Sequence, residues 1–460
     1  MRTLKWTAMS RAALVAGAGL VFAACGSGSA FAVAPDAGSD AGAPDAGPGW
    51  GAAVLVDGAA GAGLDLASAL DPQGHPAIAY FRKDGPGRYP LILARETAPG
   101  TWSTEVVPAS LDGGTLTGHY GLGLAFNPDG APALAYLGGQ AADDKSPVDH
   151  RWHDFETGDP LPSDAVLARK TSAGWTRQTL GSKSDSFVHT GFAVDDQGSE
   201  LGLWAGVAFS PDGVAHVIQR DVHFGSDQSA TDASNLEYGQ FNLAGIIAGE
   251  SVTSRVSGPA PLIHGGGNYT HLIIVNGQPA VSFALSSDSV SDAVQVWFAR
   301  RTGAGAWTRT QVSAVRGSPG HGPSLASSAT AGFALGILDA DQGDLLVATS
   351  ADGLAWSVNT VEALGETGYH PAVAFGKAGL GVLYAYCRSP IDPAGHCNPS
   401  VQELRFRLPG SAGPSGAWLE PEHVDGAVPE ATALLTDGSG NYLAVWRDPL
   451  LGLRAARRSP

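Results

Sequence analysis

Residues 66–107 read LASALDPQGHPAIAYFRKDGPGRYPLILARETAPGTWSTEVV, and this stretch decides the fold. Apolar runs at 66–70, 76–81, 91–96 and 102–107 are separated by a DPQG turn, a Gly/Pro loop and a turn with one glycine. Short runs of this kind, bounded by turn residues, predict four β-strands. One four-stranded sheet cannot bury both of its faces, so the sequence predicts further copies stacked beside it.

The same unit recurs along the chain. Later copies begin with GLGLAFNPDG, GVAFSPDG, HLIIVNG, SLASSA, PAVAFG and ATALLTDG. The last copy stops after its third strand, whereas residues 50–56 (WGAAVLV) match only a fourth strand. A closed ring needs this offset, because the first segment then completes the last sheet and leaves no edge unpaired. We therefore predict an all-β, seven-bladed β-propeller over residues 50–460; the alternative is a pair of unrelated β-sandwiches.

The composition agrees with a protein of short strands and many turns. The chain has 63 Gly and 30 Pro, and only 15% of its residues are charged, which favours turns and strands over helices. Its 44 acidic and 27 basic residues give a formal net charge of −17. This bulk charge argues against binding to nucleic acid or to an anionic membrane surface.

The N-terminal residues predict export. In residues 1–24, basic residues precede the apolar run AALVAGAGLVFAA, which is too short and too rich in Gly and Ala to span a membrane. Phe22–Gly26 resembles a bacterial lipobox in which Cys25 would receive the lipid, with Phe22 where Leu is usual. Ala30–Ala32 (AFA) offers an ordinary cleavage site instead.

Residues 25–49 form an Asp/Ala/Pro/Gly-rich linker. A flexible stalk of this kind would lift a folded domain off a membrane, which favours the anchored form. We expect an exported monomer that meets the membrane only through a lipid anchor, facing the periplasm or the exterior. The other reading is a freely secreted protein.

The repeats resemble those of bacterial sialidase-like, or Asp-box, propellers. The shared features are the xPDG turns, the "AY" second strands and a Trp that opens the outer strand, and the resemblance covers roughly residues 50–458. Ser350–Trp356 (SADGLAW) is close to an Asp box, one residue shorter than the usual form. The resemblance implies an axial site with several arginines, a Tyr/Glu pair and an Asp. Arg316 is the arginine nearest to such a position in this sequence.

Histidines recur just upstream of the predicted inner strands. In a propeller these positions lie on one face, as do the loops between second and third strands. Imidazole is the commonest protein ligand for transition metals, and carboxylates can complete a mixed shell. We predict a ligand site or a transition-metal site (Zn, Cu or Fe) at the mouth of the axial channel, with a solvated channel as the plain alternative. The predicted metal ligands are His119, His189, His264, His321, His370, Asp65 and Glu430.

Longer loops add residues to the same face. His150, Trp152, His153 and His223 are the predicted ligand-binding residues, with a glycan, a protein or a small molecule as partner. Asp339–Asp344 resembles the start of a calcium loop but lacks the distal Glu, so a hairpin turn is favoured and calcium is not expected.

Cys387 and Cys397 lie within one predicted loop of an exported protein, which predicts a disulfide between them.

Two function classes follow. The first is an exported binding protein with a His-rich site. The second is a propeller enzyme, either metal-dependent through the histidines or a glycan hydrolase that uses carboxylates such as Asp65 and Glu430. The lack of G-x-S-x-G, H-E-x-x-H and phosphate-binding glycine motifs favours the binding protein.

Overall fold

The computed structural model describes most of the repeat region. Its described residues are 49–85, 88–108, 121–138, 164–181, 200–223, 233–253, 263–287, 293–316, 324–339, 341–387, 402–426 and 430–459. Ala46–Pro460 forms one compact unit. The predicted export signal and almost all of the predicted linker lie outside the described residues. The described part of the chain contains no helix with the length and apolar character needed to cross a membrane.

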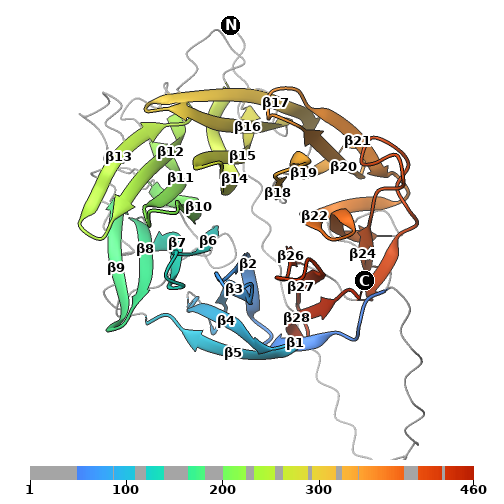
Figure 1. Ribbon diagram of the computed structural model, residues 1–460, viewed down its shortest axis with the longest axis horizontal. Helices are drawn as coiled ribbons and strands as arrows, with labels where there is room; N and C mark the ends of the chain where they lie inside the picture. The colour runs from blue at the N-terminus through green and yellow to red at the C-terminus, as the bar shows by residue number, and fades with distance from the viewer. Residues whose placement is uncertain are drawn as a thin grey trace, which may run out of the picture. The chain divides into compact units, whose positions relative to one another are not determined.

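Seven antiparallel four-stranded sheets form the blades of a ring, each numbered from the axis outward (Figure 1). The first three blades comprise β2 (Ala62–Leu70), β3 (Pro76–Arg82), β4 (Leu91–Ala98) and β5 (Thr101–Val106); β6 (Leu122–Phe126), β7 (Pro132–Gly138), β8 (Asp164–Thr171) and β9 (Gly174–Gly181); and β10 (Glu200–Phe209), β11 (Ala215–His223), β12 (Ala233–Asn242) and β13 (Gly245–Ser251).

The next three blades have the same order. They comprise β14 (Ile263–Val275), β15 (Gln278–Ser287), β16 (Ala293–Gly303) and β17 (Ala306–Arg316); β18 (Ser324–Ser328), β19 (Gly332–Asp339), β20 (Asp344–Ser350) and β21 (Ser357–Glu362); and β22 (Glu366–Gly376), β23 (Gly379–Cys387), β24 (Gln402–Arg407) and β25 (Glu422–Asp425).

The seventh blade closes the ring. It comprises β26 (Ala431–Thr436), β27 (Tyr442–Asp448) and β28 (Gly452–Arg457), and its outer strand is β1 (Val54–Asp57) from the start of the chain. Val54 pairs with Ala455 and Leu55 with Arg454, in antiparallel register. The predicted seven-bladed propeller and its closure by the N-terminal strand are confirmed. The closing strand is shorter than predicted, because Trp50 makes only an isolated bridge to Arg458.

The second strand of each blade is buried on both faces, because neighbouring blades cover it from both sides. β3 and β7 have every residue buried except Arg82 at the end of β3. These strands therefore read as continuous apolar runs, in contrast to the outer strand β5, where exposed residues dominate.

The tight turns between first and second strands are built as the xPDG pattern predicts. Asp71 Oδ1 accepts hydrogen bonds from the backbone N–H groups of Gln73 (2.9 Å) and His75 (2.8 Å). Gly74 follows at φ 83°, a conformation that glycine adopts without strain. The carboxylate of Asp71 is therefore accounted for by local turn structure.

The predicted Asp box is also a structural turn. Asp352 Oδ1 accepts the N–H of Leu354 at 2.8 Å, and the indole N–H of Trp356 donates to the Gly353 carbonyl at 3.2 Å. The Trp356 ring packs against Phe298 of the preceding blade, with ring centroids 5.2 Å apart. The motif thus holds two blades together.

Strand boundaries differ from the sequence-based expectation in the third blade and at several inner strands. The run SVTSRV (251–256) predicts the outer strand of the third blade, but β13 spans Gly245–Ser251. Asn242 causes the difference: its side-chain oxygen accepts the N–H groups of Ala244 (2.8 Å) and Gly245 (3.1 Å) and turns the chain earlier. Several inner strands also begin earlier than expected, because they contain bulges that interrupt the alternating pattern.

Candidate functional site

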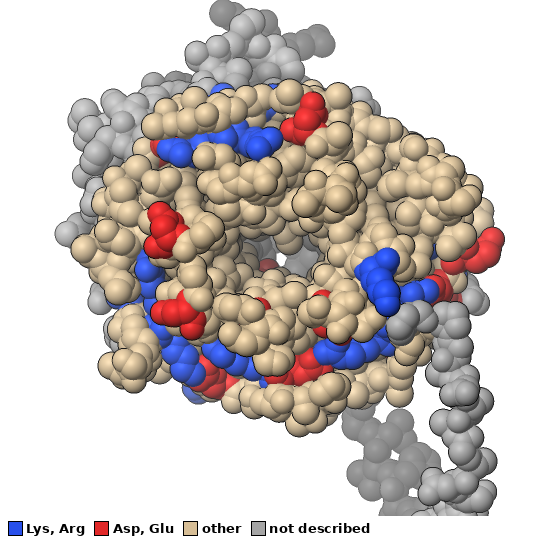
Figure 2. Space-filling model, in the orientation of Figure 1, with Lys and Arg blue, Asp and Glu red and all other residues tan. Residues whose placement is uncertain are grey.

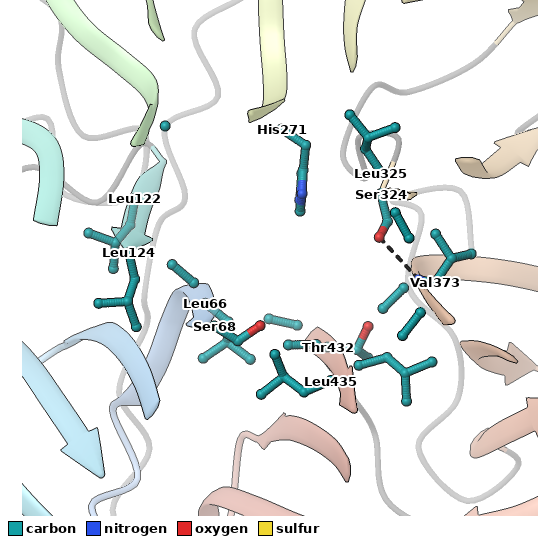
Figure 3. Close-up of a pocket in the computed structure, with 18 of the residues that line it drawn as sticks. Leu66, Ser68, Leu122, Leu124, His271, Ser324, Leu325, Val373, Thr432 and Leu435 are labelled. Atoms are coloured by element: carbon teal, nitrogen blue, oxygen red, sulfur yellow. Dashed lines mark hydrogen bonds between the residues drawn. The ribbon is translucent and has the colours of Figure 1, made fainter. Parts of the chain in front are cut away.

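The innermost strands of all seven blades surround an axial channel with a cavity volume of about 590 Å³. Each of these strands contacts the next around the ring. Figure 2 shows the hollow at the centre of the molecule, and Figure 3 shows the side chains that line it. Cavities of this size suit small molecules.

Four inner strands carry a bulge at the same place. Asp65, Trp204, Tyr269 and His370 each lie at a register shift between the first and second strand of a blade. All four have φ between 48° and 53°, a left-handed conformation that is uncommon for residues with a side chain. Bulges re-aim side chains, and strained residues of this kind cluster at functional sites.

Threonines of the following blade hold two of these bulges. The hydroxyl of Thr270 donates to the backbone carbonyl of Trp204, and the hydroxyl of Thr432 donates to that of His370. Thr432 lies at the start of β26, and Thr270 directly follows the bulge residue Tyr269 of β14. These contacts bring neighbouring inner strands together at the level of the bulges, at one mouth of the channel.

Charged groups gather at this mouth. Asp65 and Glu430 both line the channel, from the first and seventh blades. The Glu430 carboxylate forms an ion pair with the guanidinium of Arg447, which also reaches the channel lining. His370 lines the channel from the sixth blade. Asp65, His370 and Glu430, predicted from the sequence as site residues, thus lie around one opening.

An aromatic cluster borders the same mouth at the third and fourth blades. The rings of Trp204 and Tyr269 lie 5.4 Å apart, and the guanidinium of Arg220 stands 5.2 Å above the Trp204 ring. The sequence analysis did not single out either aromatic residue. A glycine two positions before each of the four bulge residues (Gly63, Gly202, Gly267 and Gly368) is the signal that could have located them.

The remaining predicted site residues are not characterised by the structure. His119, His189, His321, His150, Trp152, His153, Cys25 and Cys397 lie outside the described residues. His264 and His223 lie within β14 and β11, where only the backbone is described. No group of three or more His, Cys, Asp or Glu residues that could hold a metal occurs among the described residues. The metal site stays a prediction.

Cys387 is buried at the end of β23 and is disulfide-bonded. Its predicted partner, Cys397, lies outside the described residues, so the pairing itself stays a prediction.

His271 is a further channel residue that the repeat pattern did not single out. It follows Tyr269 by two positions in β14, and Figure 3 shows its imidazole pointing into the hollow. The side chain is exposed to the channel, yet protein surrounds it, and the loss of bulk water lowers the pKa of its imidazole. The repeat pattern predicted an inner strand that begins at His271 and a ligand upstream of it at His264, but β14 begins at Ile263 and contains both residues.

Comparisons with known proteins identify no family. No protein-family model matches the chain, and no curated protein matches its sequence. Solved structures match it only distantly. The NanB sialidase of Streptococcus pneumoniae is 10% identical with a TM-score of 0.44, covering 88% of this chain and 70% of that one. What is shared is a β-propeller fold.

Two further matches are equally distant. A protein of unknown function from Dyadobacter fermentans is 12% identical with a TM-score of 0.46, covering 76% of this chain and 95% of that one. A sialidase of Trypanosoma rangeli, solved with sialic acid, is 10% identical with a TM-score of 0.40, covering 79% of this chain and 56% of that one. Likeness at this level says nothing about activity.

Proposed function

We propose that this protein is a β-propeller binding protein whose small ligand occupies the axial channel. The observation that carries the proposal is the channel itself: about 590 Å³, with lining residues from all seven innermost strands. Aliphatic side chains such as Leu66, Leu124 and Leu435 provide apolar walls, and polar groups stand among them (Figure 3). Ligand sites in proteins combine apolar walls with polar groups that fix the orientation of the ligand.

The scaffold supports binding because the ring holds the lining strands in fixed positions. Inner strands contact each other around the whole circle, and the N-terminal strand closes the last sheet. A preformed cavity binds a ligand without the cost of ordering loops around it.

A thermal-shift screen tests the proposal. A set of small molecules that differ in charge and polarity is added to the wild-type protein and to the variant Ser68→Trp, whose indole would fill the channel. A ligand at 100 times its Kd stabilises the folded protein by about 2.7 kcal/mol. We expect at least one compound to raise the Tm of the wild type and not that of the variant.

The matched control is Ser103→Trp, because Ser103 is exposed on the outer strand β5. This variant should respond as the wild type does. The proposal is wrong if every stabilising compound acts equally on the wild type and on Ser68→Trp.

A transition metal at the mouth is a separate, narrower proposal. Its support is the position of Asp65, His370 and Glu430 around one opening of the channel, together with the histidines that recur at matching places in the sequence. Imidazole and carboxylate ligands suit Zn, Cu or Fe. Its test is described in the Discussion.

A glycan hydrolase is the alternative function, favoured by the location of two carboxyl groups, Asp65 and Glu430, at the same mouth. Glu430 is ion-paired with Arg447. Hydrolysis of chromogenic glycosides that is lost on Asp65→Asn would establish the enzyme and displace the binding proposal.

We also propose that the protein is exported and anchored through a lipid on Cys25, on the evidence of the lipobox-like sequence and the linker that follows it. Metabolic labelling with a fatty acid should mark the wild type and not Cys25→Ala. If neither protein is labelled, cleavage after Ala32 and free secretion are favoured instead.

A further inference from the structure

The interior of the channel differs from its mouth in charge. The charged residues that line the channel are Asp65, Glu430 and Arg447, and all three stand at the mouth where the inner strands begin. Farther along, the described lining consists of aliphatic, glycine, serine and threonine residues with Phe375 and His271. A charged ligand in this interior would lose its hydration without meeting an opposite charge.

Three hydroxyl groups of the lining are already engaged in holding the blades together. The Ser324 hydroxyl accepts the backbone N–H of Val373 at 3.1 Å (Figure 3). The Thr270 and Thr432 hydroxyls donate to carbonyls of the preceding blades. These three groups are therefore less available to a ligand than the unengaged polar side chains of the lining.

Four polar side chains of the lining have no hydrogen-bond partner among the described residues: Ser68 of β2, His271 of β14, Ser327 of β18 and Thr436 of β26. Of these, His271 and Ser68 belong to the fourth and first blades, on different sides of the channel, and both point into the hollow (Figure 3). A ligand between the two strands could meet both.

The fold itself does not require a histidine at position 271. In the four bulged strands, the residue two positions after the bulge is Ala67, Gly206, His271 or Ala372. Three blades thus carry a small residue where the fourth carries an imidazole. Its presence is explained if it contacts something in the channel.

We propose that the ligand is an uncharged small molecule that combines apolar surface with hydrogen-bonding groups, and that His271 is the residue that selects it. This rests on the proposed function, since it requires a ligand in the channel. The apolar walls favour the body of such a molecule by about 25 cal/mol per Å² of apolar surface removed from water. A neutral imidazole can both donate and accept a hydrogen bond.

Two dyes with one scaffold test the charge. N-phenyl-1-naphthylamine is neutral with a single N–H group, and 1-anilinonaphthalene-8-sulfonate adds a sulfonate to the same rings. In fluorescence titrations of the purified protein at pH 7.5, we expect the neutral dye to bind at least about tenfold more tightly, as a desolvated charge without a partner requires. Equal or tighter binding of the sulfonate would overturn the proposal.

Variants of His271 test the residue. His271→Phe keeps the size of the ring but removes its hydrogen bonds, and it should weaken the neutral dye about fivefold. His271→Gln restores a donor and an acceptor, so its affinity should lie close to that of the wild type. His423→Phe is the matched control, because His423 is exposed on the outer strand β25, and it should change nothing. Unchanged binding by His271→Phe would remove His271 from the proposed role.

The thermal-shift screen separates the two proposals. Charged compounds that stabilise the wild type but not Ser68→Trp would uphold the channel as the binding site and overturn the proposed ligand class. A neutral dye that binds Ser68→Trp as well as the wild type would contradict both.

Discussion

The guanidinium of Arg457 in β28 forms an ion pair with the carboxylate of Glu96 in β4, which joins the last blade to the first across 361 residues of sequence. The Glu96 side chain is only 4% exposed, and a second nitrogen of Arg457 lies 2.7 Å from Asp437. The contact supplements the β1–β28 pairing, so side chains as well as backbone hydrogen bonds close the ring.

Loss of this ion pair should destabilise the protein. Arg457→Leu leaves the Glu96 carboxylate buried without its cation, and we expect a loss of about 2 kcal/mol, below the value for a fully buried pair because Arg457 is partly exposed. Urea unfolding measures it. Lys377→Leu, a change of the same type at an exposed turn, should alter the free energy of unfolding by less than about 0.5 kcal/mol. Equal effects would show that the pair does not stabilise the ring.

Two glycines with similar backbone angles should differ in their tolerance of alanine. Gly121 has φ 91°, and a Cβ there would lie 2.2 Å from the Cα of Trp204 in the next blade. Gly213 has φ 83° with nothing within 4 Å. We expect Gly213→Ala to cost about 1 kcal/mol from the backbone conformation alone, and Gly121→Ala about 3 kcal/mol or more because blades must separate. Thermal unfolding compares them, and similar losses would contradict the close approach of these blades.

Buried His216 should make stability depend on pH. Burial lowers the pKa of its imidazole from 6.5 to about 4, with Asp212 opposing this and Arg301 adding to it. Its Nδ1 lies 2.5 Å from the Tyr238 hydroxyl. The unfolded chain therefore binds a proton that the folded protein resists, so stability is full above pH 6.5 and falls as the pH drops toward 4.

The difference between the wild type and His216→Phe isolates this effect. Between pH 7.5 and pH 5 the stability of the wild type should fall by about 2 kcal/mol more than that of the variant. Urea unfolding at the two pH values provides the measurement. Parallel pH dependence in both proteins would mean that His216 protonates freely in the folded state.

Metal analysis tests the predicted metal site. If His189 and His370 are ligands, purified protein without a His-tag should contain a stoichiometric transition metal, and changing both residues to Ala should remove most of it. Loss of two imidazole ligands should lower the affinity for the metal strongly. His75→Ala with His423→Ala, at two exposed positions, is the control. If a stoichiometric metal remains after His189 and His370 are both changed to Ala, the predicted histidine metal site at the mouth of the channel is wrong.

The sequence predicted the architecture because turns and strand order repeat in register. The offset between residues 50–56 and the incomplete last repeat identified the closure, which depends only on counting strands. Asp65, His370 and Glu430 were located at the channel for the same reason, since the repeat fixes which end of each inner strand meets the axis.

The channel interior could not be predicted in the same way. Which side chain enters the hollow depends on the bulges at Asp65, Trp204, Tyr269 and His370, and a bulge shifts the alternation by one residue without changing composition. His271 was overlooked for this reason. The hydrogen bonds from Thr270 and Thr432 join neighbouring blades. They depend on the distance between blades, which the sequence of one repeat does not give.

The central claim is that β1 pairs with β28, because only a closed ring gathers the inner strands around one channel. An engineered disulfide tests it directly. Leu55 lies opposite Arg454 in the register, and Cα atoms of paired antiparallel residues stand about 4.5–5.5 Å apart, within disulfide reach. Leu55→Cys with Arg454→Cys should form an intramolecular cross-link on mild oxidation and migrate faster on a non-reducing gel. Leu55→Cys with Leu243→Cys, from the exposed hairpin of the third blade, should not. Absence of the first cross-link, or equal formation of both, would contradict the ring and the channel inferred from it.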